Sequence, residues 1–201
     1  MPKARDLTTN GRREQILDEA LRLFVAHGAQ NVSTRHIARA VGISQPSLYA
    51  HFPNRDAIAV ELCCRAFGEL RNRLLGAISG TDMAPVAHLR AIGRTYIEFG
   101  LDNAAAYQIA FMLDLPPEAT PEKSKVLMAG VNAFAVLRNL FGPAISGQAD
   151  RDIIAQSTWA SMHGLVALLI ARSEIPWADT NRLVETHLDG ICLIASPYLK
   201  G

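Results

Sequence analysis

Hydrogen-bonding side chains are concentrated between Ser33 and Asp56, in the sequence STRHIARAVGISQPSLYAHFPNRD. Arginine, glutamine, serine, threonine, tyrosine and histidine side chains can bind the edges of bases and the phosphates of a nucleic acid. A short helix rich in such residues is expected from about Gln45 to His51. When a neighbouring helix holds it rigidly, a helix of that composition is suited to the major groove of DNA.

Two capping serines and a glycine predict how this segment folds. Ser33 can accept a hydrogen bond from the first turn of one helix, and Ser44 can do the same for the next helix, which has Pro46 in its first turn. Gly42 lies between them, where a left-handed residue ends the first helix. The second helix is only two turns long, and a helix of that length needs packed neighbours to be stable in water.

The surrounding chain is predicted to be helical. An amphipathic helix precedes the segment, with apolar residues at Ile16, Leu17, Ala20, Leu21 and Phe24. A long helix capped by Asn54 follows and runs to about Ile78. Five more helices are expected at about residues 85–103, 107–113, 120–141, 150–171 and 179–196. No segment alternates with the period of a strand, so the predicted fold class is all-α with about nine helices.

The N-terminal part resembles the DNA-binding domain of the TetR family of transcriptional regulators. The resemblance covers residues 12–62 and is carried by segments 13–24, 37–38, 40–44, 47–49, 51–52 and 55–56, with Gly28 and Thr34. It implies an N-terminal three-helix, helix-turn-helix DNA-binding domain over residues 1–55, with a linking helix from about residue 54. It also implies a C-terminal helical domain over residues 56–201 for effector binding and dimerisation.

The resemblance also implies DNA contacts for individual residues. Thr34 matches a position that binds a phosphate, and Arg35 matches one that can reach a guanine edge. Gln45 could pair with an adenine edge, and Pro46 could pack against a thymine methyl group. Further contacts to phosphates or bases are expected from Ser44, Ser47, Tyr49, His51 and Arg55.

Some residues of the short helix also have a structural interpretation. Tyr49 and His51 could hold the helix in place instead of contacting DNA, whereas Leu48 and Phe52 are expected to anchor it by burial. The tripeptide from Gln45 to Ser47 differs from the Lys-Gly-Thr that is common in the family. The base preference therefore cannot be copied from typical members.

Charge is unevenly distributed along the 201 residues, although the formal net charge is only +1. Residues 1–55 contain 8 Lys and Arg against 4 Asp and Glu, whereas residues 56–201 contain 12 against 15. A basic N-terminal part on a mildly acidic body is typical of a DNA-binding module. The three cysteines and six histidines lack metal-ligand spacing, and the common catalytic motifs are missing, so no enzyme, metal site or cofactor is expected. A redox role for Cys63 or Cys64 stays open.

Residues 153–171 carry no charged side chain and approach the length of a membrane span. Five polar residues (Gln156, Ser157, Thr158, Ser161 and His163) make the segment too polar for that role, and the N-terminus does not resemble a signal peptide. We therefore expect a cytoplasmic protein with no membrane partner. The half from Leu165 to Ala171 is apolar on all sides and must be covered on all sides. A second copy could cover it, which predicts a homodimer through the two C-terminal helices.

The run from Thr158 to Leu165 is similar to the C-terminal domain of a TetR subgroup named for its Trp-His-Gly motif. Its Trp159 and His163 are four residues apart and share one helix face. In one interpretation both are core residues, and Gly164 allows helices to cross closely at the dimer interface. In the other, they line a largely apolar cavity for a small-molecule effector together with Tyr96, Phe99, Tyr107, Phe111, Met112 and Met128.

The expected function is that of a homodimeric repressor, released by a ligand from a palindromic operator in double-stranded DNA. The dimer would have one state in which the spacing of its two DNA-binding domains matches the two half-sites, and another in which it does not. A ligand that binds the second state more tightly would weaken DNA binding by its difference in affinity for the two states. Activation instead of repression is also compatible with the sequence. The alternative is a helical ligand-binding or protein-interaction module without DNA binding, whose binding would not weaken steeply with salt.

Overall fold

The computed structural model describes residues 9–80, 82–112, 121–142 and 148–200. Within these residues the chain forms nine α-helices and two short 3-10 helices, and the β-structure there is limited to one isolated bridge between Phe141 and Leu199. The all-α fold predicted from the sequence is confirmed. The first elements are α1 (Thr9–His27), η1 (Ala29–Asn31), α2 (Thr34–Val41), α3 (Gln45–Tyr49) and α4 (Arg55–Ile78). They are followed by α5 (Pro85–Asp102), α6 (Ala104–Met112), α7 (Pro121–Arg138), α8 (Gln148–Ala171), α9 (Thr180–Ala195) and η2 (Ser196–Tyr198).

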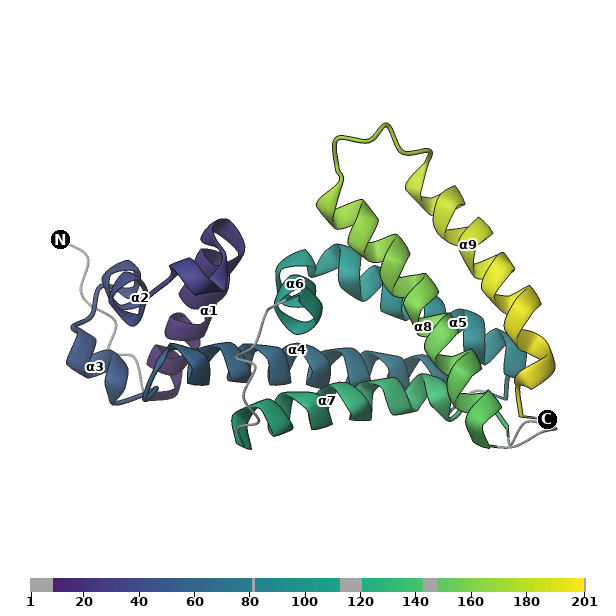
Figure 1. The fold of residues 1–201 in the computed structure, drawn as a ribbon, viewed down its shortest axis with the longest axis horizontal. Coiled ribbons are helices and arrows are strands. Elements are labelled where there is room, and N and C mark those ends of the chain that lie inside the picture. The colour runs from purple at the N-terminus through teal and green to yellow at the C-terminus, as the bar shows by residue number, and fades with distance from the viewer. Residues whose placement is uncertain (1–8, 81, 113–120, 143–147, 201) are drawn as a thin grey trace. The chain divides into compact units, whose positions relative to one another are not determined.

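The helices are grouped in two compact units (Figure 1). Unit 1 comprises residues 1–66 and 105–126, and unit 2 comprises residues 67–104 and 127–201. Helix α4 runs without interruption for 24 residues and contributes to both units. The division of the chain into units therefore falls within α4, whereas the domain boundary after residue 55 stays a prediction.

Apolar side chains fix the three short elements of unit 1 around α1. Helix α2 packs against both α1 and α3. The side chains at the centre of this cluster are almost completely buried: Ile16, Leu17, Phe24, Ile37, Leu48 and Phe52. Helix α3 has only five residues, so its position depends on the burial of its central residue, Leu48.

The turn between α2 and α3 has the caps that the sequence predicts. The hydroxyl group of Ser33 accepts a hydrogen bond from the backbone N–H of His36, and the hydroxyl group of Ser44 accepts one from that of Ser47. Gly42 ends α2 in the left-handed conformation, with φ 75° and ψ 34°. These local interactions satisfy N–H groups that otherwise lack a partner at a helix start, and they fix the entry into α3.

The linking helix α4 is also capped as predicted. The side-chain oxygen Oδ1 of Asn54 accepts a hydrogen bond of 2.7 Å from the backbone N–H of Ala57. Helix α3, by contrast, ends at Tyr49 and not at His51, and residues 50–53 form the turn into α4. The backbone N–H of Phe52 still donates to the carbonyl oxygen of Leu48, and Phe52 precedes Pro53, where helical conformation is disfavoured, so the helix cannot continue further.

Unit 2 is built on close contact between α5 and the two C-terminal helices. Helix α5 packs against α8 and α9, which also contact each other. Gly93 permits this approach, because a Cβ atom placed there would lie only 2.7 Å from Cδ2 of the buried Leu188. The buried residues of α5 are Leu89, Ile92, Gly93, Tyr96, Ile97, Phe99 and Gly100.

The cysteines in the structure are packing residues. The thiol of Cys63 is buried and donates a hydrogen bond of 3.3 Å to the carbonyl oxygen of Ile109. Burial raises the pKa of Cys63 to about 12, and burial also raises the pKa of Cys64 and of Cys192. Because the thiolate is the reactive form, burial lowers the reactivity of these thiols in the folded protein.

We therefore expect the native protein to resist thiol reagents. At about pH 8 Cys63 has almost no thiolate, so an aromatic disulfide reagent should label the folded chain slowly and the guanidinium-unfolded chain rapidly at all three cysteines. The measurement is the absorbance of the released thiol over time. Rapid reaction of one equivalent in the folded protein would show that a cysteine is accessible and activated.

Candidate functional site

The residues expected to contact DNA lie on α2, on α3 and its two flanking turns, and at the start of α4, all within unit 1. Helix α3 buries Leu48 and turns its other side chains outward, so that Tyr49 is 47% exposed. Arg35, Ser44, Pro46 and Ser47 are also exposed. The remaining members of the predicted set, Thr34, Gln45, His51 and Arg55, are half-buried.

Three of these side chains form a closed polar triangle across α2 and α3. The amide nitrogen Nε2 of Gln45 donates to Oη of Tyr49 at 3.1 Å and to Oγ1 of Thr34 at 3.2 Å. The two hydroxyl oxygens are 3.3 Å apart and share the third hydrogen bond. The structure thus brings together residues that are up to 15 positions apart in the sequence, and it leaves them at the surface.

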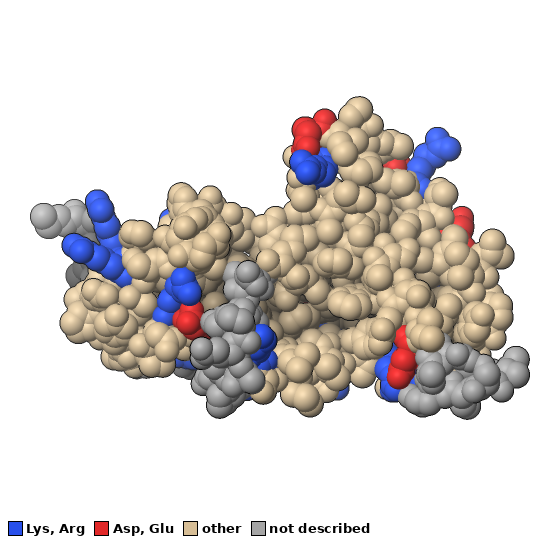
Figure 2. Space-filling view, in the orientation of Figure 1, with Lys and Arg blue, Asp and Glu red and all other residues tan. Residues whose placement is uncertain are grey.

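Arg35 is an exposed cation on the surface predicted to contact DNA. It lies in the first turn of α2, next to Thr34, and within the described residues its guanidinium has no hydrogen bond or ion pair. Arg39 is likewise exposed one turn later on α2. Figure 2 shows Lys and Arg side chains projecting close to α2, without Asp or Glu beside them on the face in view. An unpaired arginine in such a position can bind a guanine edge or a phosphate without first breaking an ion pair.

Ser44, Ser47 and Arg55 already have structural roles. The hydroxyl groups of Ser44 and Ser47 are 2.9 Å apart at the cap of α3. The guanidinium of Arg55 donates to the carbonyl oxygen of Ala29 at 3.1 Å and to the carboxylate of Asp56 at 2.8 Å. Their contacts with DNA stay predictions, and any such contact would be made alongside these bonds or in exchange for them.

Two residues that position the site were missed by the sequence analysis. Arg13 donates to the backbone oxygen of His51, pairs with Glu61, and lies 4.1 Å from the ring centroid of Phe52. It thereby connects α1 to the turn after α3, but nothing in the local sequence marks this long-range contact. His36 completes a capping box, because its ring nitrogen Nδ1 accepts from the backbone N–H of Ser33 at 3.3 Å. The spacing of three residues from Ser33 was a usable signal for that role.

A shallow groove lies beside the polar triangle. It is open to solvent and runs between the start of α2 and the turn into α4. Its lining is Gln30, Asn31, Val32, Ser33, Thr34, Tyr49, Pro53, Asn54 and Arg55. Hydroxyl, amide and guanidinium groups in one concave strip are suited to the phosphate backbone of a nucleic acid.

In unit 2, the aromatic residues that the sequence singles out are partly assembled around Trp159. The indole N–H of Trp159 donates to Oη of the buried Tyr96 at 3.0 Å. The Trp159 ring lies 5.9 Å from the ring of Phe134 and 6.0 Å from that of His163. Burial lowers the pKa of His163, so its imidazole is neutral at physiological pH. Trp159 and His163 are therefore neighbours on α8, as their spacing predicts.

The other residues proposed for an effector cavity are distributed between the two units. Phe99 of unit 2 is buried, with the guanidinium of Arg73 5.4 Å from its ring centroid, whereas Met128 is exposed. Unit 1 contains the tilted ring pair Tyr107 and Phe111, with ring centroids 4.6 Å apart, and the exposed Met112. Membership of these residues in one cavity stays a prediction.

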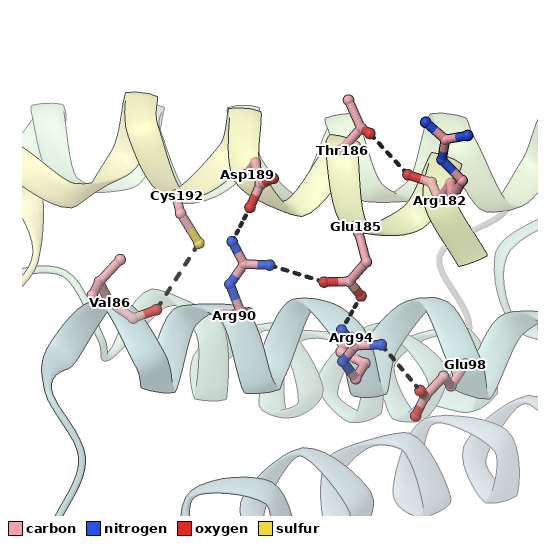
Figure 3. Close-up of polar contacts among 9 residues, drawn as sticks. All are labelled: Val86, Arg90, Arg94, Glu98, Arg182, Glu185, Thr186, Asp189 and Cys192. Carbon is pink, nitrogen blue, oxygen red and sulfur yellow. Dashed lines mark hydrogen bonds and ion pairs between the residues drawn. The ribbon is translucent and has the colours of Figure 1, made fainter. Parts of the chain in front are cut away.

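Helix α9 is fixed to α5 by an ion-pair network (Figure 3). Arg90 pairs with Glu185 at 3.1 Å and also with Asp189, and Arg94 pairs with Glu185 as well. The network ends at Glu98, 3.9 Å from Arg94. The carboxylates of α9 come from residues four apart, so they face the two arginines of α5, which are also four apart. This network lies at the surface and holds the outer side of α9 in register with α5.

Several apolar side chains of α8 and α9 are uncovered in the single chain. Leu193 is 79% exposed, and Ile153, Leu168 and Ile194 are also largely exposed. By length and composition alone, the segment of α8 from Arg151 to Ala171 is long and apolar enough to cross a membrane. Only 22% of its most apolar stretch is buried within the described chain. A groove between the two helices is lined by residues that include the Ser161–His187 pair, whose polar atoms are 3.2 Å apart.

Comparisons with known proteins match both parts of the chain. The family described as "Bacterial regulatory proteins, tetR family" matches residues 16–62, and the family described as "Tetracyclin repressor-like, C-terminal domain" matches residues 89–191. The class D tetracycline repressor protein of Escherichia coli is 42% identical over 57 residues, which are 26% of this chain and 26% of that protein.

A second curated relative and one solved structure extend the comparison. The HTH-type transcriptional repressor Rv1474c of Mycobacterium tuberculosis is 36% identical over 58 residues, which are 29% of this chain and 31% of that protein. The matches thus span less than a third of the length of these two curated relatives. The fatty acid degradation regulator FadR from Bacillus halodurans has a similar fold, with a TM-score of 0.73 and 15% identity, over 96% of this chain and 97% of that one.

Proposed function

Because the chain belongs to the TetR family of bacterial regulatory proteins, we propose that it is a DNA-binding transcriptional regulator. The observation that carries this proposal is the surface of α2 and α3. Leu48 is buried while Tyr49 and Arg35 are exposed, so the short helix is anchored on one side and presents hydrogen-bonding groups on the other. Such a rigid presentation is what a major-groove reader needs.

The proposed active form is a cytoplasmic homodimer that binds a palindromic operator in double-stranded DNA. The uncovered apolar side chains of α8 and α9 support it, because a second copy related by a two-fold axis would bury them and pair the two DNA-binding surfaces. Gly164 adds to this support. A glycine within a helix costs about 1 kcal/mol relative to alanine, and a Cβ atom at Gly164 would meet nothing within 4 Å in the described part of the chain. Close packing of a partner helix at the interface would account for a glycine at this position.

The proposed regulation is release of the repressor by a small, largely apolar effector that binds in the C-terminal domain, in the manner of the Trp-His-Gly subgroup. The phenol of Tyr96, which accepts a hydrogen bond from Trp159, and the neutral imidazole of His163 would supply its few polar contacts. Helix α4 belongs to both units, so a ligand that favours one position of α4 would change the spacing of the two DNA-binding surfaces. No enzymatic activity is proposed.

Selection of DNA by the purified protein tests the proposed function. Genomic fragments are bound, washed and sequenced, and we expect enrichment of one palindromic motif with half-sites about 34–36 Å apart or a multiple of that. Binding should fall steeply as salt rises, because Lys and Arg displace counterions from phosphates. Failure to enrich any motif, or affinity independent of salt, would favour a helical ligand-binding or protein-interaction module.

We expect Arg35→Ala to weaken operator binding about 5- to 150-fold without changing the melting temperature. The reason is that a bidentate arginine contact contributes about 1–3 kcal/mol, whereas Arg35 makes no hydrogen bond or ion pair within the described residues. Titration of labelled operator gives the affinity, and circular dichroism gives the melt. The matched control is Arg22→Ala, which removes the same charge from an exposed arginine of α1 that is paired with Glu19. Equal losses in the two variants would argue for a general charge effect and against a base contact.

A further inference from the structure

The carboxamide of Gln45 is held in one orientation by hydroxyl groups from two helices. Its Nε2 lies 3.2 Å from the hydroxyl oxygen of Thr34 on α2 and 3.1 Å from that of Tyr49 on α3, and these two oxygens are 3.3 Å apart. Three polar atoms in a triangle require three hydrogens to satisfy all three contacts. The amide nitrogen supplies two, and one of the hydroxyl groups supplies the third.

The opposite orientation of the carboxamide satisfies the triangle less well. If Oε1 were inside, it would accept from both hydroxyl groups, and no hydrogen would remain for the contact between Thr34 and Tyr49. The triangle therefore favours the amide nitrogen inside. Both N–H groups of Gln45 are then used within the protein, and its carbonyl oxygen Oε1 is the group left for a partner outside.

A carbonyl oxygen recognises hydrogen-bond donors only. In the major groove, adenine and cytosine each present an exocyclic amino group, whereas guanine and thymine present acceptors. A freely rotating glutamine can instead bind adenine with both its oxygen and its nitrogen, which would select adenine over cytosine. The orientation of the Gln45 amide thus decides between two base preferences.

We propose that Thr34 and Tyr49 are positioning residues that lock Gln45 as an acceptor, so that each half-site has one position where adenine or cytosine is accepted and guanine or thymine is rejected. The proposal depends on the proposed DNA-binding function and specifies its base preference. It also replaces the sequence-based expectation of a contact with adenine alone.

The test is selection from a randomised double-stranded DNA library by the full-length protein, followed by titration of synthetic duplexes that carry each of the four bases at every motif position. We expect one position per half-site where adenine and cytosine bind within about threefold of each other. Guanine and thymine should bind about tenfold or more weakly there, as expected when one hydrogen bond is lost and two acceptors face each other. Gln45→Ala should equalise the four bases at that position and at no other.

Two substitutions test whether Tyr49 orients the Gln45 amide or contacts DNA itself. Tyr49→Phe removes one corner of the triangle from an exposed ring, so folding should be unchanged, and the preference against guanine and thymine should shrink to within about threefold. Gln45→Glu puts a carboxylate at this position, and a carboxylate can only accept hydrogen bonds. The variant should therefore prefer adenine and cytosine even when it is combined with Tyr49→Phe. A phosphate contact by the Tyr49 hydroxyl would lower affinity equally for all four bases and would not move this ratio.

Several results would overturn the inference. Wild-type selection of adenine over cytosine by more than tenfold would show that the amide rotates and binds adenine with both atoms. Selection of guanine or thymine would show that the amide nitrogen faces the base. An unchanged preference in Tyr49→Phe would show that the triangle does not hold Gln45. Each of these results leaves a palindromic motif in place, whereas the absence of any enriched motif would count against the proposed function itself.

Discussion

Leu193→Asp is expected to convert the proposed dimer into monomers and to abolish high-affinity binding to a palindromic operator, while the chain stays folded. In the single chain Leu193 is 79% exposed, so an aspartate there is hydrated and costs the fold little. At an interface formed by α8 and α9 the same carboxylate would be buried without a partner, once in each copy because of the two-fold symmetry. A penalty of about 4 kcal/mol would raise the dimer dissociation constant roughly a thousandfold.

Sedimentation velocity with operator titration measures both effects, and the chain offers a close control. Leu127 on α7 is 65% exposed, so Leu127→Asp adds the same charge to another exposed apolar position outside α8 and α9. We expect this control to stay dimeric and to bind DNA normally. If Leu127→Asp dissociates the dimer and Leu193→Asp does not, the interface includes α7 instead of α9. A dimer that survives both changes would show that neither face is the interface.

The parts of the fold that the sequence predicted well are those determined by near neighbours. Ser33, Gly42, Ser44 and Asn54 act within one helical turn of their own positions, and each was assigned its role correctly. The one clear boundary error in this region is the end of α3. The helix was expected to reach His51, but the turn before Pro53 begins after Tyr49.

The interactions that could not be predicted join residues far apart in the chain. Arg13 reaches the backbone of His51 across 38 positions, and Arg55 reaches the carbonyl oxygen of Ala29 across 26. An arginine in a basic N-terminal segment resembles a DNA contact whether or not it is used within the protein. The same limit applied to the triangle of Thr34, Gln45 and Tyr49, whose members were each expected to contact DNA separately. Only the fold shows that they contact one another.

The C-terminal half was less predictable because it consists mostly of apolar residues, which do not specify their contact partners. Trp159 and His163 could be placed on one face from their spacing, and the rings are neighbours in the structure. The spacing could not tell that the partner of Trp159 is the Tyr96 hydroxyl, 63 positions earlier. In α9 the helical spacing of the apolar residues was more informative, since Ile191 and Cys192 share the buried face whereas Leu193 and Ile194 are exposed.

Leu48→Ala is expected to destabilise unit 1 by about 2–5 kcal/mol and thereby to remove DNA binding at physiological temperature. Leu48 is the only fully buried residue of the five-residue helix α3. Truncation of its side chain leaves a cavity beneath a helix that is unstable without packing. Domains are stable by only about 5–15 kcal/mol, which makes the loss a large share of the total. Differential scanning calorimetry and hydrogen exchange at the α3 amides measure it.

Two further variants show whether binding is lost through α3 itself. Leu48→Met nearly conserves side-chain volume and should cost less than about 1.5 kcal/mol, so DNA binding should persist. Leu89→Ala creates a comparable cavity at a fully buried leucine of α5 in unit 2, and it should lower stability while the α3 amides stay protected. If Leu48→Ala leaves exchange at α3 unchanged, then burial of this side chain does not hold the helix. In that case the rigid presentation on which recognition of the operator depends must come from the caps at Ser44 and Ser47 and from the polar triangle with Thr34.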